Sequence, residues 1–233
     1  MNARSVFTAA AVLLALAGCK PALNPVVAQL EQWERLASSG RQDAIAGDAV
    51  TGACTSEPAR PGCGRLHALH GEALLHMALA TRAPGAACPA GGEQAAALDG
   101  RLAAAAADLA QARGGGDSGI DAAGRTKLAA LGAQAQYCRA EIATSFPAAA
   151  SAARAAQAEA AQAGPAERAL WQGRAALLLA RPGQGDDVAR CAAARQAEQA
   201  ALAGQSAGSY GEQFARLLAD ARARRATLAN CGG

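Results

Sequence analysis

The sequence contains a serine in the setting that many hydrolases use for nucleophilic catalysis. Gly204, Ser206 and Gly208 match the pattern GxSxG, in which the serine stands on a sharp turn between a strand and a helix and a histidine follows later in the chain. Here the preceding residues favour a helix, and all three histidines come before the serine. We therefore interpret residues 204–208 as a loop between two helices and assign no catalytic residue.

The three histidines stand within one segment that is expected to be helical. His67 and His70 are three residues apart and would share a face, where the two could hold a metal ion. His76 would lie about 240° around the helix from His70 at 3.6 residues per turn, and the HExxH pattern of zinc hydrolases is absent. We predict ordinary, partly exposed histidines, with no metal and no cofactor.

Two further features could indicate a chemical site, but each also has an ordinary structural interpretation. Residues 114–119 are rich in glycine but lack the Gly-Lys-Ser/Thr ending of a phosphate-binding loop, so we predict a linker. No paired-carboxylate site is apparent, because the candidate glutamates are expected on polar helix surfaces. These glutamates are Glu141, Glu159, Glu167 and Glu198.

Positive charge is modest overall and gathers near the end of the chain. The net charge of +3 argues against nucleic acid as a partner. Arg222, Arg224 and Arg225 are expected to complement the C-terminal end of the last helix. Contact of these arginines with anionic lipid headgroups is the alternative.

The first twenty residues have the features of a secretory signal. Arg4 precedes an apolar run over residues 6–15, which is too short to cross roughly 30 Å of hydrocarbon as a permanent helix. The run ends in Leu16-Ala17-Gly18-Cys19. This ending resembles the lipobox of bacterial lipoproteins.

The resemblance implies how the chain is processed and where it is held. In that family residues 1–18 would be removed as a signal peptide, and Cys19 would carry diacylglycerol on its sulfur and an acyl chain such as palmitate on its amine. Several acyl chains hold a protein firmly on a membrane. Lys20 rather than an aspartate follows the cysteine, which in this family indicates the periplasmic face of the outer membrane. An ordinary signal peptide that leaves Cys19 as a free thiol is the alternative.

The remaining six cysteines are predicted to form structural disulfides. They are Cys54, Cys63, Cys88, Cys138, Cys191 and Cys231. Six is an even number, and the periplasm is oxidising. Fifteen connectivities are possible and the sequence alone does not choose between them; we expect pairing between neighbours, as 54–63, 88–138 and 191–231. Neither a CxxC pair nor zinc-finger spacing is present.

The composition predicts helices that pack closely. Hydrophobic residues make up 52% of the chain but aromatic residues only 3%, and about 70 residues are alanine, the strongest helix former. We expect residues 19–23 to be the lipidated cysteine and a short tether, and residues 24–233 to be one all-α periplasmic domain.

Prolines, glycines and apolar spacing divide this domain into segments. Asn24 followed by Pro25 is typical of a helix start. We expect helices over 25–38, 42–50, 65–83, 93–113, from the glycine-rich break to 145, over 147–163, 165–180, 186–203 and from 209 to 228, with a loop over 51–64. No strand pattern is present. The fold is predicted to be all-α, built from antiparallel helical hairpins that form either a repeat array or an irregular bundle, stapled by disulfides.

Four of these helices carry a glycine at a similar place, namely Gly71, Gly132, Gly173 and Gly211. A glycine inside a helix costs up to about 1 kcal/mol relative to alanine, so the four glycines predict a second helix pressed close at each position. With Trp171 early in the third unit, the pattern resembles the first helix of tetratricopeptide repeats. The spacings of 61, 41 and 38 residues are longer than that family's period of about 34.

Together these features favour a non-catalytic outer-membrane lipoprotein. It would be attached to the membrane through lipid on Cys19 and would bind a protein partner of the cell envelope, as an interaction or assembly module. Two alternatives remain open at this point. One is a periplasmic enzyme that acts on cell wall or lipid, and the other is a carrier of a small ligand or metal centred on His67 and His70.

Overall fold

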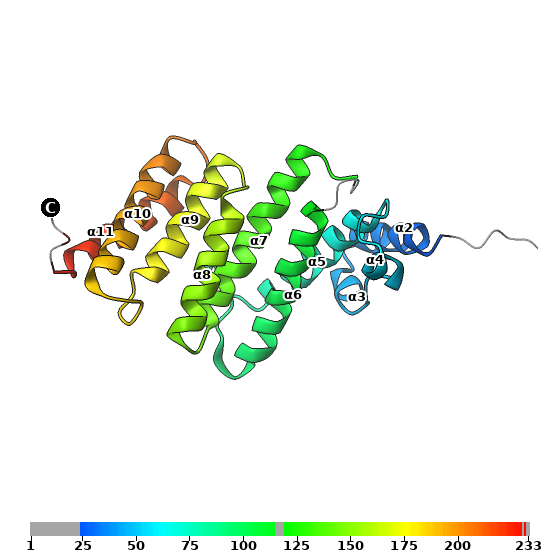
Figure 1. Ribbon diagram of the computed structural model, residues 1–233, viewed down its shortest axis with the longest axis horizontal. Helices are drawn as coiled ribbons and strands as arrows, with labels where there is room; N and C mark the ends of the chain where they lie inside the picture. Colours follow the sequence, from blue (N-terminus) through cyan, green and yellow to red (C-terminus); the bar gives the residue numbers. More distant parts are fainter. Residues whose placement is uncertain (1–23, 115–118, 230, 232–233) are drawn as a thin grey trace, which may run out of the picture.

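The computed structural model describes residues 24–114, 119–229 and 231, and within these residues it is all-α with no β-strand (Figure 1). The predicted signal peptide, Cys19 and the tether lie outside the described residues, as does most of the predicted linker over 114–119. None of the described helices is long and apolar enough to cross a membrane.

The helices follow one another in space in the order of the sequence. They are α2 (Pro25–Ser38), α3 (Gln42–Ala46), α4 (Gly52–Ser56), α5 (Cys63–Leu79), the 3-10 turn η1 (Gly92–Gln94), α6 (Ala95–Gly114), α7 (Ala122–Ile142), α8 (Phe146–Ala160), α9 (Pro165–Leu179), α10 (Asp187–Gln205) and α11 (Gly211–Ala226). From α5 onward each helix packs against the next, which runs back alongside it, and α2–α4 and α11 lie at opposite ends of the row (Figure 1).

The odd-numbered helices form a layer of their own. Besides its sequence neighbours, α7 packs against both α5 and α9, and α9 packs against α11. Within the described chain, the even-numbered helices α6, α8 and α10 make no comparable contact with one another. The predicted antiparallel hairpins are therefore confirmed, and one face of the row is built from α5, α7, α9 and α11.

Three of the four predicted glycines do lie where a second helix comes close. A methyl group on Gly71 would stand 3.1 Å from the backbone oxygen of Ala105 on α6, and one on Gly173 would stand 3.1 Å from the methyl group of Ala200 on α10. A methyl group on Gly132 would meet a side chain of α8. These glycines set the spacing of the hairpins, because they remove the side chain at the point of closest approach.

The prediction for Gly211 is wrong. Gly211 is exposed at the first position of α11, and nothing lies within 4 Å of where its side chain would begin. The residue before it, Tyr210, has φ 61, in the left-handed region that non-glycine residues rarely occupy. The glycine therefore belongs to a tight helix start rather than to a helix–helix contact.

Most expected helices agree with the structure, and the differences fall near the N-terminus. The 42–50 segment is helical only to Ala46. The predicted loop over 51–64 contains the short helix α4 and the first turn of α5. A five-residue helix offers too few positions to show an apolar period, and the Cys54–Cys63 disulfide joins it to the start of α5.

The core consists of a central part, two end clusters and two smaller clusters between neighbouring helices. The central part lies between α5 and α11 and consists largely of alanine and leucine. At the N-terminal end, α2–α4 pack on α5 around the fully buried indole of Trp33. At the C-terminal end, Ala180, Cys191 and Leu228 form a small cluster with Cys231.

The three disulfides join the pairs that neighbour pairing predicted. Cys54–Cys63 lies in the N-terminal cluster and Cys191–Cys231 in the C-terminal cluster. The third bond, Cys88–Cys138, attaches the loop between α5 and η1 to α7. One covalent link therefore stabilises each end of the row, and the third fixes a long loop against the layer of odd-numbered helices.

Candidate functional site

One cavity lies on the face formed by the odd-numbered helices. It has a volume of about 700 Å³ and is bounded by α7, α9, α11 and the loop between α5 and η1. Two smaller cavities adjoin it. One, of about 540 Å³, shares Ala87 and Tyr137 with it, and the other, of about 420 Å³, shares Leu177 and Arg181. Together the three make one continuous depression, which we call the groove.

The Cys88–Cys138 disulfide shapes one wall of the groove. It bonds the loop between α5 and η1 to α7, and the carbonyl oxygen of Ala87 lies 3.6 Å from the sulfur of Cys138. Ala86 and Ala87 on this loop line the central cavity and the first of its neighbours. The bond therefore holds in place a segment that has no regular structure of its own.

Aromatic side chains are concentrated in the groove. The chain has only two tyrosines and two tryptophans, and Tyr137, Trp171 and Tyr210 all line the central cavity. The rings of Tyr137 and Trp171 lie 5.6 Å apart at 45°. Aromatic rings supply large contact areas at little entropic cost and are enriched in binding surfaces.

Tyr210 shows a second feature that is typical of binding sites. It is 39% exposed, and it is the only described non-glycine residue with positive φ. Its hydroxyl donates to Glu167 at 3.2 Å. A backbone in this conformation costs on the order of 1 kcal/mol or more, and such strained residues cluster at functional sites.

Arg174 is a partly buried cation of the groove that has no carboxylate partner. Its guanidinium lies 5.0 Å from the centre of the Trp171 ring and donates to the amide oxygen of Gln213 at 2.8 Å. No described carboxylate stands within ion-pair distance of it. Burial lowers the pKa of Arg174, and the negative charge of the more distant Glu141 offsets only part of this effect.

Arg181 and Arg216, which line the same cavity, differ from Arg174 in this respect, whereas exposed Arg82 also has no ion pair within the described chain. Arg181 donates to Glu141 at 2.9 Å, and the hydroxyl of Tyr137 donates to the same carboxylate at 2.5 Å. Burial and the charge of Glu141 raise the pKa of Tyr137, so its hydroxyl stays protonated. Arg216 pairs with Glu212 at 3.4 Å.

His67 and His70 come together, but around a carboxylate. Their Nδ1 atoms lie 2.7 and 2.6 Å from the two oxygens of Asp108 on α6, and His70 stacks on Trp33 at 5.6 Å. Burial alone would raise the pKa of Asp108, but the hydrogen bonds from the two histidines outweigh it and hold the pKa below its ordinary value of 3.8. An ionised carboxylate only accepts hydrogen bonds, so both Nδ1 atoms carry hydrogen.

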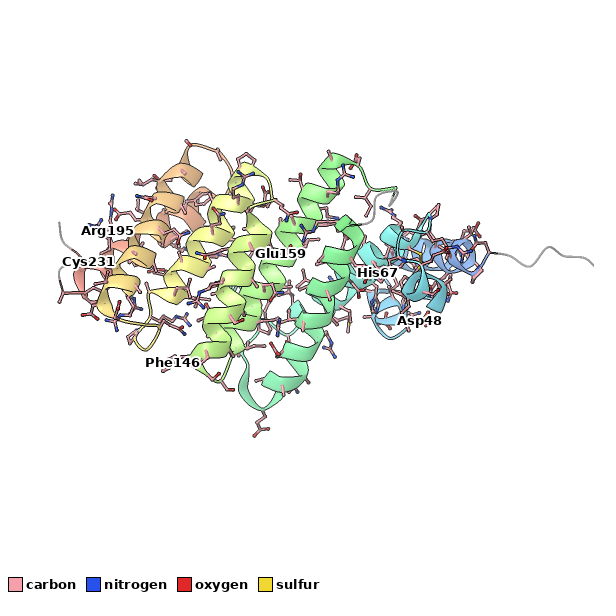
Figure 2. The ribbon with its side chains drawn as sticks, viewed as in Figure 1. Asp48, His67, Phe146, Glu159, Arg195 and Cys231 are labelled. Atoms are coloured by element: carbon pink, nitrogen blue, oxygen red, sulfur yellow. A yellow bond between two sulfur atoms is a disulfide. The ribbon has the colours of Figure 1, made fainter. Side chains whose placement is uncertain are left out.

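This cluster joins the N-terminal elements to the hairpin of α5 and α6, as the position of His67 in Figure 2 indicates. Both Nε2 atoms are buried and have no partner among the described groups. Within the described residues, no group of three potential ligands could hold a metal ion. The expectation of partly exposed histidines is therefore wrong for His67, which is 6% exposed, but it holds for half-buried His70 and for His76, which is exposed and lies apart from the cluster.

The remaining candidates have structural partners. Ser206 lies at the end of α10 and its hydroxyl donates to the carbonyl of Ala203 at 2.7 Å, as expected for a helix-terminating loop. The four glutamates are not simply solvated, because each accepts from a named neighbour. Glu141 accepts from Tyr137 and Arg181, Glu159 from Arg113, Glu167 from Tyr210, and Glu198 from Arg222 and Arg225.

Two arginines close the C-terminal end. Arg195 donates to the carbonyl of Cys231 at 3.3 Å (Figure 2). Arg225 donates to the same oxygen at 3.2 Å. Hydrogen bonds from Arg225 and Arg222 hold the pKa of Glu198 below its ordinary value. Two of the three arginines at the end of the last helix are thus engaged within the fold.

No known family model, curated protein or solved structure matches the chain. The residues of the groove were not predicted as a site from the sequence. Their one sequence signal is that three of the four tyrosine and tryptophan residues stand about one hairpin apart in the chain, on or beside helices that the fold then places side by side.

Proposed function

We propose that the chain is an outer-membrane-anchored periplasmic lipoprotein that acts as a non-catalytic protein-interaction or assembly module. Lipid on Cys19 would hold it at the membrane, and the groove would receive a protein partner. The observation that carries the proposal is the groove itself, in which both tyrosines of the chain, one tryptophan and an uncompensated arginine meet.

The chemistry of the groove supports binding rather than turnover. Its tyrosine hydroxyls already donate to Glu141 and Glu167, and the raised pKa of Tyr137 keeps its hydroxyl protonated, so it is not available to accept a proton. Its arginines supply fixed positive charge and hydrogen-bond donors. Such a surface recognises a ligand by shape, stacking and charge.

The position of the groove supports a protein as the ligand. Adjoining cavities along several helices offer an extended surface, whereas small-molecule sites are usually single enclosed pockets. The hairpins also present this face repeatedly, which is how stacked helical arrays build binding surfaces.

The anchor is tested by replacing its acceptor. We expect Cys19→Ala to move the protein from the membrane fraction to the soluble periplasmic fraction, because no acyl chain can then be attached. Cell fractionation with immunoblotting measures this shift. A variant that remains in the outer membrane as fully as the unchanged chain would contradict the lipid anchor.

Partner binding is tested by filling the groove. Gln134 lies on α7 and lines the central cavity, so Gln134→Trp should displace a bound partner. Gln196→Trp is the matched control, because Gln196 is exposed on α10 outside the groove. We expect a partner that co-purifies from detergent-solubilised envelopes with the unchanged chain and with the control, and is lost with Gln134→Trp. Identical co-purification with all three proteins would contradict the proposal.

A further inference from the structure

The charges of the groove are unbalanced in one direction. The three adjoining cavities are lined by five arginines and three carboxylates; they are Arg82, Arg174, Arg181, Arg216 and Arg224, and Glu141, Glu212 and Asp220. Two of these carboxylates already form ion pairs: Glu141 with Arg181, and Glu212 with Arg216. The groove therefore has positive charge that the described chain does not neutralise.

This excess positive charge is energetically least favourable at Arg174, because that guanidinium is partly removed from solvent. Its guanidinium is half-buried against Trp171 and is held by one neutral amide, that of Gln213. A partly desolvated cation without a carboxylate is unfavourable, and a ligand carboxylate would restore the missing interaction. A guanidinium presents donors in a planar fork that matches a carboxylate.

We propose that the groove binds an extended acidic polypeptide segment, one carboxylate of which pairs with Arg174 while a neighbouring apolar side chain packs beside Tyr210. The inference rests on the proposed function and specifies the chemistry of the partner. The side-chain amides of Gln134 and Gln213, which line the same cavity, supply donors and acceptors for the backbone of the segment. An extended chain fits the run of three adjoining cavities better than a single compact ligand does.

The test supplies Arg174 with a carboxylate from within the protein. Gln213→Glu is nearly isosteric and places a carboxylate where the amide oxygen now lies, 2.8 Å from Arg174. The variant should fold at least as well as the unchanged chain, and it should occupy the guanidinium that the ligand needs. Gln196→Glu is the matched control, since it adds the same charge on α10 outside the groove.

Binding is measured by fluorescence anisotropy with two labelled peptide pools and the full-length chain in mild detergent. One pool has glutamate and phenylalanine in an alanine–serine background, and the other has glutamine in place of glutamate. We expect the unchanged chain and Gln196→Glu to bind the glutamate pool at least about tenfold more tightly than the glutamine pool, as for a hydrogen bond to a charged group. Gln213→Glu should lose this preference.

Other outcomes overturn the inference. Equal affinity for the two pools, or a preference that Gln213→Glu retains, would remove the role of Arg174. If phosphatidylglycerol vesicles bind in a Gln213-dependent way and neither pool does, the ligand is a lipid and not a peptide. If the peptide test fails but Gln134→Trp still displaces a partner from envelopes, only this inference is wrong. If Gln134→Trp also fails to displace a partner, the proposed function is wrong as well.

Discussion

Asp108 connects two parts of the protein through a single carboxylate. It accepts from His67 and His70 of α5, and His70 in turn stacks on Trp33 of α2. The carboxylate is mostly buried, with 15% of its side chain exposed. A buried acceptor with two donors should contribute more to stability than an exposed ion pair does.

We expect Asp108→Asn to lower the free energy of unfolding by on the order of 2 kcal/mol at neutral pH. The asparagine amide has one oxygen that can accept and one nitrogen that can only donate, so it cannot accept from both histidines as the two carboxylate oxygens do. Urea denaturation followed by circular dichroism measures this loss. Asp99→Asn on the same helix is the control: its ion pair with Arg139 is more exposed, and its loss should cost less than about 1 kcal/mol. Equal losses in the two variants would contradict the role of Asp108.

The difference in stability between the unchanged chain and Asp108→Asn should change with pH, and the lowered pKa of Asp108 determines the direction of the change. The pKa of Asp108 is depressed in the folded state, so its contribution is present above the ordinary value of 3.8 and is lost as the pH falls through the depressed value. The stability gap between the unchanged chain and Asp108→Asn should therefore be full at neutral pH and should narrow in strong acid. Denaturation midpoints measured across this range test the prediction, and a gap that widens in acid would contradict it.

At the scale of the elements, glycines determine how closely the helices pack. A methyl group on Gly71 would press on the backbone of α6 at Ala105 and Leu109, and backbone atoms cannot rotate away as a side chain can. Gly100, also within a helix, has nothing within 4 Å of the same position. The two residues therefore separate the packing effect of a glycine from its cost to helix formation.

We expect Gly71→Ala to destabilise the protein by about 1–3 kcal/mol, since overpacking must push α5 and α6 apart. Gly100→Ala should instead stabilise it by up to about 1 kcal/mol, because alanine favours the helix and meets no neighbour. Thermal denaturation should therefore show a lower melting temperature for Gly71→Ala and a higher one for Gly100→Ala than for the unchanged chain. A stabilising effect of Gly71→Ala would show that the hairpin is not closely packed there.

The Cys88–Cys138 bond is expected to affect binding as well as stability. Replacing both cysteines with alanine should cost about 4 kcal/mol by the loop-entropy model, and it should also weaken binding because the loop that carries Ala86 and Ala87 is released. Removing Cys54–Cys63 should cost about 3 kcal/mol and leave peptide affinity unchanged, since that bond lies outside the groove. The anisotropy assay of the acidic peptide pool, run below each melting temperature, distinguishes the two.

These elements differ in how much of them the sequence could predict. Pro25 and Pro165 mark helix starts because their fixed φ suits the first turn, and both helices begin at the predicted residue. The helix α4 was missed because five residues show no period. Gly211 was wrongly grouped with the packed glycines, since a glycine that relieves crowding and one that starts a helix look alike until the neighbouring helix is placed.

The groove could not be predicted from the sequence, because its residues are far apart in the chain. Tyr137, Trp171 and Tyr210 lie on or beside three different helices, and their meeting depends on how α7, α9 and α11 stack. Asp108 likewise has no pattern that links it to the histidines. Local signals fix where helices begin and end, whereas sites made from side chains of several helices require the packing itself.

At the scale of the whole molecule, contacts are made between neighbours along the row. The two end clusters, one around Trp33 and one around Cys231, share no buried residue with each other or with the central core, and only partly buried Ala46 packs against both the Trp33 cluster and the core. In such arrays stability is divided among local units, and opening at one end need not spread to the other.

We therefore expect the loss of one terminal disulfide to have a local effect. With Cys191 and Cys231 both replaced by alanine, amide hydrogen exchange should accelerate in the C-terminal part of α11 and at the start of α10, while the hairpin of α5 and α6 keeps its protection. In the variant without Cys54 and Cys63, exchange should accelerate in α2–α4 and at the start of α5, while α10 and α11 keep their protection. Uniform acceleration along the chain in either variant would show that the row unfolds as one unit.

The pairing of the cysteines in chain order bears on how the protein matures. Each described disulfide joins a cysteine to the next one in the sequence, and the bonds are neither interleaved nor nested. If the leader delivers the chain to the periplasm from its N-terminus, an oxidase that couples thiols in their order of arrival forms the native bonds directly. Secretion would then need an oxidase but no isomerase to correct the pairing, and each disulfide could form before the next pair of cysteines has crossed the membrane.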